Sequence, residues 1–124
     1  MVFYVALGGA LGASGRYLVG VWAGRMFGAG FPYGTLCVNI LGCFLMGVVI
    51  EAAALKYSLS QEMRAFLTTG ILGGFTTFSA FALDFAFLYE RKASLLAAFY
   101  LGASVLGSIL ALFAGLWLMR AVLQ

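Results

Sequence analysis

Four long apolar segments follow one another along this chain, and only a few polar or glycine-rich residues separate each from the next. A bilayer core about 30 Å thick is crossed by roughly 20 apolar residues in a helix, and each segment reaches that length. The pattern therefore predicts an all-α integral membrane protein, built as one domain over residues 1–124 with four transmembrane helices. The predicted helices are Phe3–Phe27, Thr35–Leu55, Glu62–Tyr89 and Leu95–Val122.

Composition narrows the class of protein further. Hydrophobic residues make up 65% of the chain and charged residues only 9%, whereas a soluble domain has about 25% charged residues. The chain has no histidine, which excludes histidine-dependent catalytic triads and the usual zinc sites, so we expect no enzyme. The basic residues are scattered rather than gathered into a stripe. We therefore expect membrane lipid around the protein, no nucleic acid and no other protein partner.

Basic residues are divided evenly between the two ends of the predicted helices. With an even number of helices, both termini lie on one side of the membrane. An excess of lysine and arginine on one side normally orients a membrane protein, and here there is none. The balance is either a chance result of small numbers or a sign that the chain inserts both ways and pairs as an antiparallel, dual-topology homodimer. The two sides carry Lys56, Arg64 and Arg120 with the termini, and Arg25, Arg91 and Lys92 opposite.

Glycine is unusually frequent, with 17 residues in the chain. Small residues four apart lie on one helix face and let two helices approach closely. We therefore expect close helix packing and, because four short helices do not easily enclose a pathway, an oligomer. The small residues in such spacing are Gly8 and Gly12, and Ala103, Gly107, Ala111 and Gly115.

The third segment is unusual for a transmembrane helix. The run from Thr68 to Phe81 mixes glycine, threonine and phenylalanine, and adjacent glycines followed by two β-branched residues form helix poorly. The sequence thus favours a break near Gly73–Thr77, whose freed carbonyl groups would be buried in protein, face a cavity or hold a cation. The alternative is an intact helix with a packing face of glycine and threonine.

A few polar and aromatic side chains inside the predicted spans are the candidates for chemistry. Phe78 and Phe81 share a helix face, and their electropositive ring edges can contact a small anion; the alternative is packing or lipid contact. Asn39 offers amide hydrogens that either hold helices together or line a path. Further hydroxyl donors follow one line that starts near the membrane surface: Thr35, Tyr100 and Ser104.

Charged residues inside the predicted spans are rare. Arg16 is a functional candidate by default, the alternative being a snorkelling side chain or one in a water-filled vestibule. Asp84 lies five residues before Tyr89, which is about 7.5 Å along a helix, so we expect it to reach water. No two carboxylates are spaced for acid–base catalysis, and no phosphate-binding loop is present.

Short motifs occur once in each predicted helix, in order along the whole chain. They are Gly8–Ala13 with Arg16 and Tyr17, Gly34–Asn39 with Gly42, Gly70–Phe81, and Tyr100–Ser104. Together they resemble the Fluc (CrcB) fluoride channel family, and the motif in the third helix is highly specific.

The resemblance implies a bacterial inner-membrane channel that exports fluoride passively and lowers its concentration in the cytoplasm. Members of the family are dual-topology homodimers with two pores, which agrees with the even distribution of basic residues. The phenylalanines at the positions of Phe78 and Phe81 line the pores in the family. The residues that match Asn39 and Tyr100 lie close to them.

The resemblance also implies a structural sodium ion at the dimer interface. The backbone carbonyls of Gly73 and Thr76 from both subunits would hold it. Arg16 matches a family arginine near the aqueous vestibule. Two residues depart from the family pattern: Ala80 stands where many members carry a hydroxyl, and Asp84 stands where glutamate is common.

Two other kinds of protein share some of these features. A small multidrug exporter also has four helices and dual topology, but it needs an acidic residue in the first helix to exchange protons for cationic drugs. The first predicted helix has none. A structural tetraspan subunit would not require Asn39, the phenylalanine pair and the glycine–threonine segment together.

Overall fold

The computed structural model describes residues 1–28, 30–56 and 58–123, and all regular structure in those ranges is helical. Four helical spans are long and apolar enough to cross a membrane, judged by length and composition. This confirms the predicted all-α membrane class with four spans. The long helices are α1 (Val2–Phe27), α2 (Tyr33–Leu55) and α6 (Ser94–Leu123), and the third span (Gln61–Glu90) is made of shorter elements.

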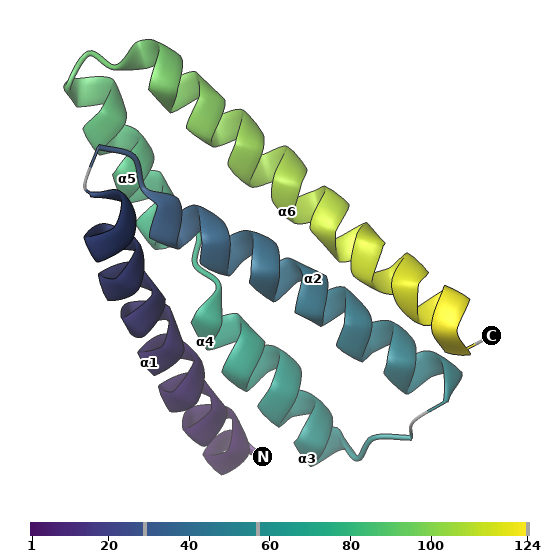
Figure 1. Ribbon diagram of the computed structural model, residues 1–124. Helices are drawn as coiled ribbons and strands as arrows, with labels where there is room; N and C mark the ends of the chain where they lie inside the picture. The colour runs from purple at the N-terminus through teal and green to yellow at the C-terminus, as the bar shows by residue number, and fades with distance from the viewer. Residues whose placement is uncertain (29, 57, 124) are drawn as a thin grey trace.

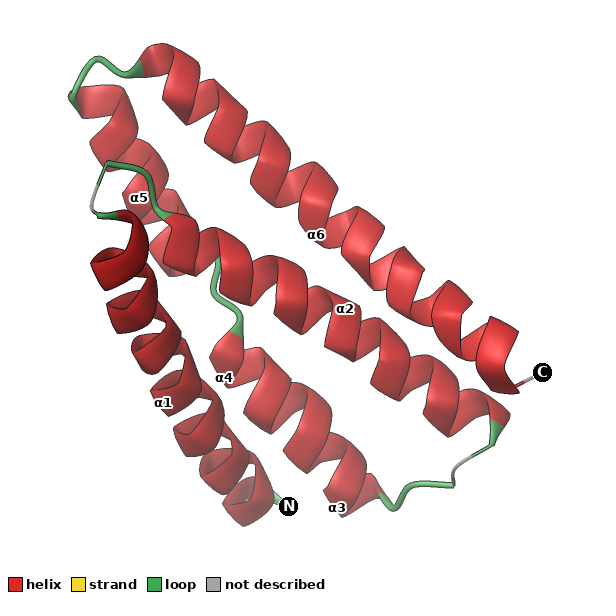
Figure 2. Ribbon diagram, viewed as in Figure 1, coloured by secondary structure: helices red, strands yellow, loops and turns green. Residues whose placement is uncertain are grey.

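The third span contains four consecutive elements: α3 (Gln61–Arg64), η1 (Ala65–Leu72), α4 (Gly73–Phe75) and α5 (Ser79–Glu90). The element η1 is a π-helix, a rare form that is frequent at functional sites. Residues 76–78 are not helical, and the backbone of Thr76 is extended, with φ −85° and ψ 159°. Figure 2 shows this stretch as a green connection between α4 and α5.

The helices pack as two main pairs joined through α2. The long helices α2 and α6 lie side by side, and α1 packs against η1 and α4 (Figure 1). Both chain ends and the α2–α3 connection lie at one end of the molecule, whereas the α1–α2 and α5–α6 connections lie at the other. The basic residues of the connections are therefore distributed over the two ends as the sequence predicts.

Glycines let these helices approach backbone to backbone. A Cβ atom at Gly115 of α6 would lie 2.9 Å from the Val48 nitrogen, and one at Gly47 would lie 3.2 Å from the Cα of Gly115. On α1, a Cβ atom at Gly8 would lie 2.6 Å from the Phe66 carbonyl oxygen. Backbone atoms cannot move aside as a flexible side chain can, so these positions need glycine. The predicted close packing at Gly8 and Gly115 is confirmed.

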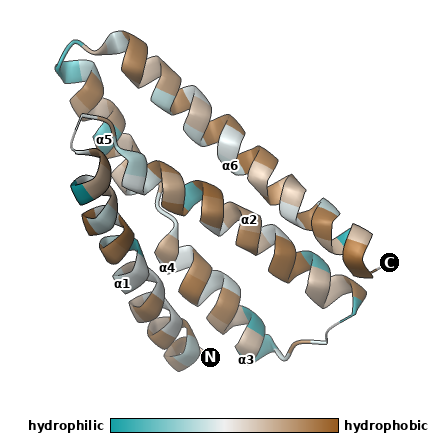
Figure 3. Cartoon of the chain, in the orientation of Figure 1, coloured by the Kyte–Doolittle hydropathy of each residue, from teal (hydrophilic) through white to brown (hydrophobic). Residues whose placement is uncertain are grey.

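Large apolar side chains point outward along the spans. Leu95 is 85% exposed and Phe3 is 72% exposed, and hydrophobic colours dominate the helices in Figure 3. Soluble monomers rarely expose apolar patches of this extent, whereas lipid chains cover them in a bilayer. The largest fully buried side chains in the described ranges are Tyr100 and Val38. The protein is therefore a multi-pass membrane protein.

Candidate functional site

An asparagine on α2 holds the non-helical segment of the third span in place. The Asn39 Nδ2 donates a hydrogen bond to the Thr77 carbonyl oxygen at 2.9 Å, and the Thr77 amide donates to Asn39 Oδ1 at 2.7 Å. The Ala80 amide, in the first turn of α5, donates to Thr77 Oγ1 at 3.1 Å. Backbone groups at membrane depth must be satisfied within the protein. The side-chain amide of Asn39 supplies partners that the interrupted helix does not.

Other backbone groups beside this segment have different partners. The Arg16 Nε donates to the Gly74 carbonyl oxygen at 3.2 Å, which ties α1 to α4. The Thr76 hydroxyl donates back to the Leu72 carbonyl oxygen at 3.0 Å. Among the described residues, none donates a hydrogen bond to the carbonyl oxygen of Gly73 or Thr76. These two oxygens keep their lone pairs free for another ligand.

An aromatic cluster continues from the non-helical segment into α5 and α6. The ring centroids of Phe78 and Phe81 lie 5.5 Å apart, and those of Phe81 and Tyr100 lie 5.2 Å apart. Phe81 and Tyr100 are buried, whereas Phe78 is 78% exposed on this single chain. The Tyr100 hydroxyl donates to Asp84 Oδ2 at 3.2 Å. Its one O–H hydrogen is therefore already in use.

A cavity of about 260 Å³ lies among α2, the start of α5 and α6. It brings together four of the residues predicted for a pathway, namely Asn39, Phe78, Phe81 and Ser104. The amide group of Asn39 has two hydrogens, and the bond to Thr77 uses one of them. The Ser104 Oγ is buried and has no hydrogen-bond partner among the described residues. The cavity thus offers an N–H group, an O–H group and aromatic rings to a small anion.

Three polar or sulfur-containing residues of this cavity are absent from the predicted site residues: Cys43, Thr77 and Ser108. Cys43 follows Asn39 by four residues, and Ser108 follows Ser104 by four. Residues four apart share a helix face, so this spacing is the signal that identifies both. Thr77 lies at the cavity because it pairs with Asn39 on another helix, and no local sequence pattern indicates that.

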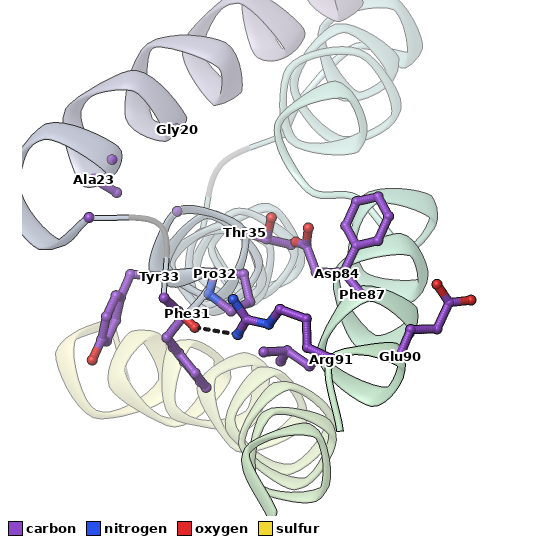
Figure 4. Close-up of a pocket in the computed structure, with 15 residues that line it drawn as sticks. Gly20, Ala23, Phe31, Pro32, Tyr33, Thr35, Asp84, Phe87, Glu90 and Arg91 are labelled. Atoms are coloured by element: carbon purple, nitrogen blue, oxygen red, sulfur yellow. Dashed lines mark hydrogen bonds between the residues drawn. The ribbon is translucent and has the colours of Figure 1, made fainter. Parts of the chain in front are cut away.

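Two more cavities hold three other predicted residues, whereas Tyr100 lines none of the three cavities. Thr35 and Asp84 line a cavity of about 580 Å³ (Figure 4). Arg16 and Thr35 line a neighbouring cavity of about 510 Å³ that shares Gly20 with it. Thr35 lies at these two cavities and Ser104 at the 260 Å³ cavity, and both side chains lie beside the Tyr100 hydroxyl.

Comparison with known proteins identifies the family. Residues 3–116 match the family described as "CrcB-like protein, Camphor Resistance (CrcB)". The chain belongs to the CrcB family. It is 58% identical to a protein named "Fluoride-specific ion channel FluC" from Chelativorans sp. (strain BNC1), over 96% of this chain and 95% of the relative. A protein of the same name from Agrobacterium fabrum (strain C58) is 58% identical over 94% of this chain and 93% of the relative. Another from Rhodopseudomonas palustris (strain BisB5) is 52% identical over 95% of each chain.

The donor groups present in this CrcB chain limit which ions it can hold. In the described ranges, His, Cys, Asp and Glu form no group of three or more that could bind a metal ion. The free carbonyl oxygens of Gly73 and Thr76 are a different kind of donor. Carbonyls of interrupted helices can coordinate sodium in transporters, so the chemistry of these two groups fits a sodium ion.

Proposed function

We propose that this CrcB chain forms a fluoride-selective channel that exports fluoride passively across the bacterial inner membrane. Its similarity to relatives named as fluoride-specific ion channels, over at least 93% of their length, supports this. The structural observation that carries the proposal is the 260 Å³ cavity. There an amide N–H of Asn39, the rings of Phe78 and Phe81 and the unpaired hydroxyl of Ser104 converge.

Passive export follows from the charge of fluoride. Hydrogen fluoride is a weak acid that crosses a membrane as the neutral molecule and releases fluoride at neutral pH. The fluoride ion is then trapped in the cytoplasm by its charge. A membrane potential negative inside drives an anion outward with about 2.3 kcal/mol per charge for every 100 mV. A selective pore therefore suffices, without a coupled ion or ATP.

The residues of the cavity replace the hydration shell of the ion. Asn39 and Ser104 supply hydrogen-bond donors, and Phe78 and Phe81 supply electropositive ring edges. These contacts must favour the ion enough to admit it, yet release it again. Tyr100 acts through Asp84, to which it donates, and through its packing against Phe81.

The two larger cavities form the aqueous vestibule in this proposal. Arg16 and Thr35 line one of them, and Thr35 and Asp84 line the other. Arg16 donates only through its Nε among the hydrogen bonds of the described residues. Its terminal nitrogens are free to attract an anion towards the pathway.

We propose that two copies pair antiparallel. The even distribution of basic residues supports insertion in both orientations, and the exposed ring of Phe78 gains cover if a second copy packs there. The test is a single cysteine at Ser94, with Cys37 and Cys43 replaced by alanine. This variant changes no charged residue, so it leaves the orientation signal intact. We expect impermeant thiol reagents to label about equal populations from the two membrane faces. A single orientation would contradict the proposal.

We propose a sodium ion at the Gly73 and Thr76 carbonyls of both subunits. The free carbonyl oxygens support it, and a ligand that binds only the assembled protein stabilises that assembly. Replacing sodium by a large organic cation is expected to shorten the lifetime of the dimer and to lower fluoride flux. Dimer exchange between differently labelled copies measures the lifetime independently of transport. An unchanged lifetime and flux in sodium-free buffer would refute the site.

The test of function is fluoride efflux from proteoliposomes of the purified protein. A potassium ionophore removes the opposing potential, and a fluoride electrode follows release. We expect rapid fluoride release, with chloride retained in parallel vesicles. A multidrug exporter would instead exchange protons for cationic drugs. That exchange needs an acidic residue in the first helix, and α1 carries none. A structural tetraspan subunit would release neither anion. Absence of fluoride release from vesicles with intact protein would overturn the proposed channel.

A further inference from the structure

The 580 Å³ cavity lies at the end of the bundle where two connections meet, and it contains opposite charges. The α1–α2 connection and the end of α5 form much of its wall (Figure 4). Its charged lining residues are Asp84, Glu90 and Arg91. The two carboxylates outnumber the guanidinium, so the lining repels an anion overall. Within this cavity, Arg91 is the one lining residue whose charge attracts an anion.

Arg91 is held in a defined place in this cavity. Its Nη2 donates to the Gly30 carbonyl oxygen at 2.9 Å, which joins positions 61 residues apart in the chain. The dashed line in Figure 4 marks this bond. The bond links the end of α5 to the connection between α1 and α2, and both segments line the cavity. The guanidinium group is planar and rigid, so fixing one nitrogen also restricts the others.

The charge of Arg91 is not neutralised by an ion pair. Within the described residues, Arg120 and Glu51 form the one ion pair, at 3.0 Å, on α6 and α2. Asp84 accepts a hydrogen bond from the neutral hydroxyl of Tyr100. The field of Arg91, an exposed residue, therefore acts on the space of the cavity and is screened by dissolved salt.

Arg91 also lies in line with the aromatic pair. Phe81, Asp84, Leu88 and Arg91 follow at intervals of three or four residues, the spacing that keeps residues on one helix face. The ten residues from Phe81 to Arg91 correspond to about 15 Å along a helix. One face of α5 thus carries both Phe81, at the 260 Å³ cavity, and Asp84, at the 580 Å³ cavity, and Arg91 follows at its end.

We propose that Arg91 is a positioning residue for fluoride access: its bond to Gly30 fixes one positive charge in the vestibule, and that charge offsets Asp84 and Glu90. This rests on the proposed channel function. Fluoride concentration at the vestibule rises with the local potential, so the rate at which subsaturating fluoride reaches the pathway depends on Arg91.

The test compares Arg91→Gln with Arg91→Lys and Lys92→Gln in proteoliposomes at subsaturating fluoride. Background salt is set to about 0.01 M or about 1 M, where the screening length is roughly 30 Å or 3 Å. Lys92→Gln is the control: it removes the neighbouring positive charge, which does not line the cavity. Because it removes the same charge from the same end of the molecule, any effect on orientation in the membrane is the same as in Arg91→Gln. We expect Arg91→Gln to lower efflux roughly three- to tenfold at low salt, with little difference from wild type at high salt. Arg91→Lys restores most of the rate, and Lys92→Gln shows no comparable loss.

Glu90→Gln provides a second, opposite test that leaves Arg91 in place. It removes a negative charge from the same lining, so efflux at low salt is expected to rise. Equal, salt-independent losses in Arg91→Gln and Arg91→Lys would overturn the electrostatic role and leave only a structural bond to Gly30. Wild-type efflux in Arg91→Gln at low salt would overturn the role entirely. If the wild-type protein releases fluoride while the variants give either of these two results, the proposed channel function stands and the role of Arg91 fails. If the wild-type protein releases no fluoride, the channel function and the role of Arg91 are both refuted.

Discussion

Replacing Phe78 by isoleucine is expected to lower fluoride efflux at least tenfold while the protein stays folded. Isoleucine keeps the position apolar but removes the aromatic ring edge that can face an anion. Phe78 is 78% exposed on a single chain, so the change removes little packing within that chain. Fluoride-electrode efflux and size-exclusion elution of the same preparation measure the two properties separately.

Phe81→Ile is expected to lose flux as well, with a larger effect on stability. Its ring is buried against both Phe78 and Tyr100, and reshaping a packed site typically costs up to about 1.5 kcal/mol when volume is nearly conserved. Phe113→Ile is the matched control, because Phe113 is partly exposed, contacts the ring of Trp117 at a centroid distance of 5.9 Å and lines none of the three cavities. Normal flux in folded Phe78→Ile and Phe81→Ile would show that the rings only pack.

The four spans could be predicted from the sequence because the bilayer imposes the length of an apolar helix. The ends of the helices were less determined. The second helix begins at Tyr33 rather than Thr35, directly after Pro32, and the fourth begins at Ser94 rather than Leu95. Polar and aromatic residues near a membrane surface are compatible with both a helix and a connecting loop. Capping and turn geometry, rather than hydropathy, decide where the helix starts.

Helical spacing predicts neighbours within one helix but not partners between helices. The spacing of Phe78 and Phe81 indicated that their rings lie close, and the centroid distance of 5.5 Å agrees. Asn39 could be identified as a polar group needing a partner, but its partner Thr77 is 38 residues away. That pairing depends on how α2 packs against the third span, which hydropathy and spacing do not specify.

The position of a polar residue relative to a cavity was also beyond the sequence. Tyr100 and Ser104 are four apart on α6, yet the Tyr100 hydroxyl bonds to Asp84 while Ser104 lines the 260 Å³ cavity. A helix turn of about 5.4 Å separates such residues along the axis. At that scale, neighbouring helices determine which buried hydroxyl has a hydrogen-bond partner and which lies beside a cavity.

Asn39→Ala is expected to lower both fluoride flux and stability, because one side chain serves the segment and the cavity together. The change removes two hydrogen bonds to Thr77, of 2.9 and 2.7 Å. A buried backbone group left without a partner costs about 1–3 kcal/mol, and both the amide and the carbonyl of Thr77 lose theirs. The amide hydrogen that faces the cavity is lost too, so we expect flux to fall more than tenfold.

Cys43→Ala is the matched control for Asn39→Ala. Cys43 lies one helical turn further along α2 and lines the same cavity, but neither its backbone nor its side chain bonds to the non-helical segment in the described structure. Efflux and thermal unfolding, measured by loss of the size-exclusion peak after heating, are expected to stay near wild type. Asn39→Ala with the same melting behaviour and flux as Cys43→Ala would mean that residues 76–78 hold their shape without the asparagine. That outcome would contradict both proposed roles of Asn39, which are to position the interrupted helix and to contact the ion.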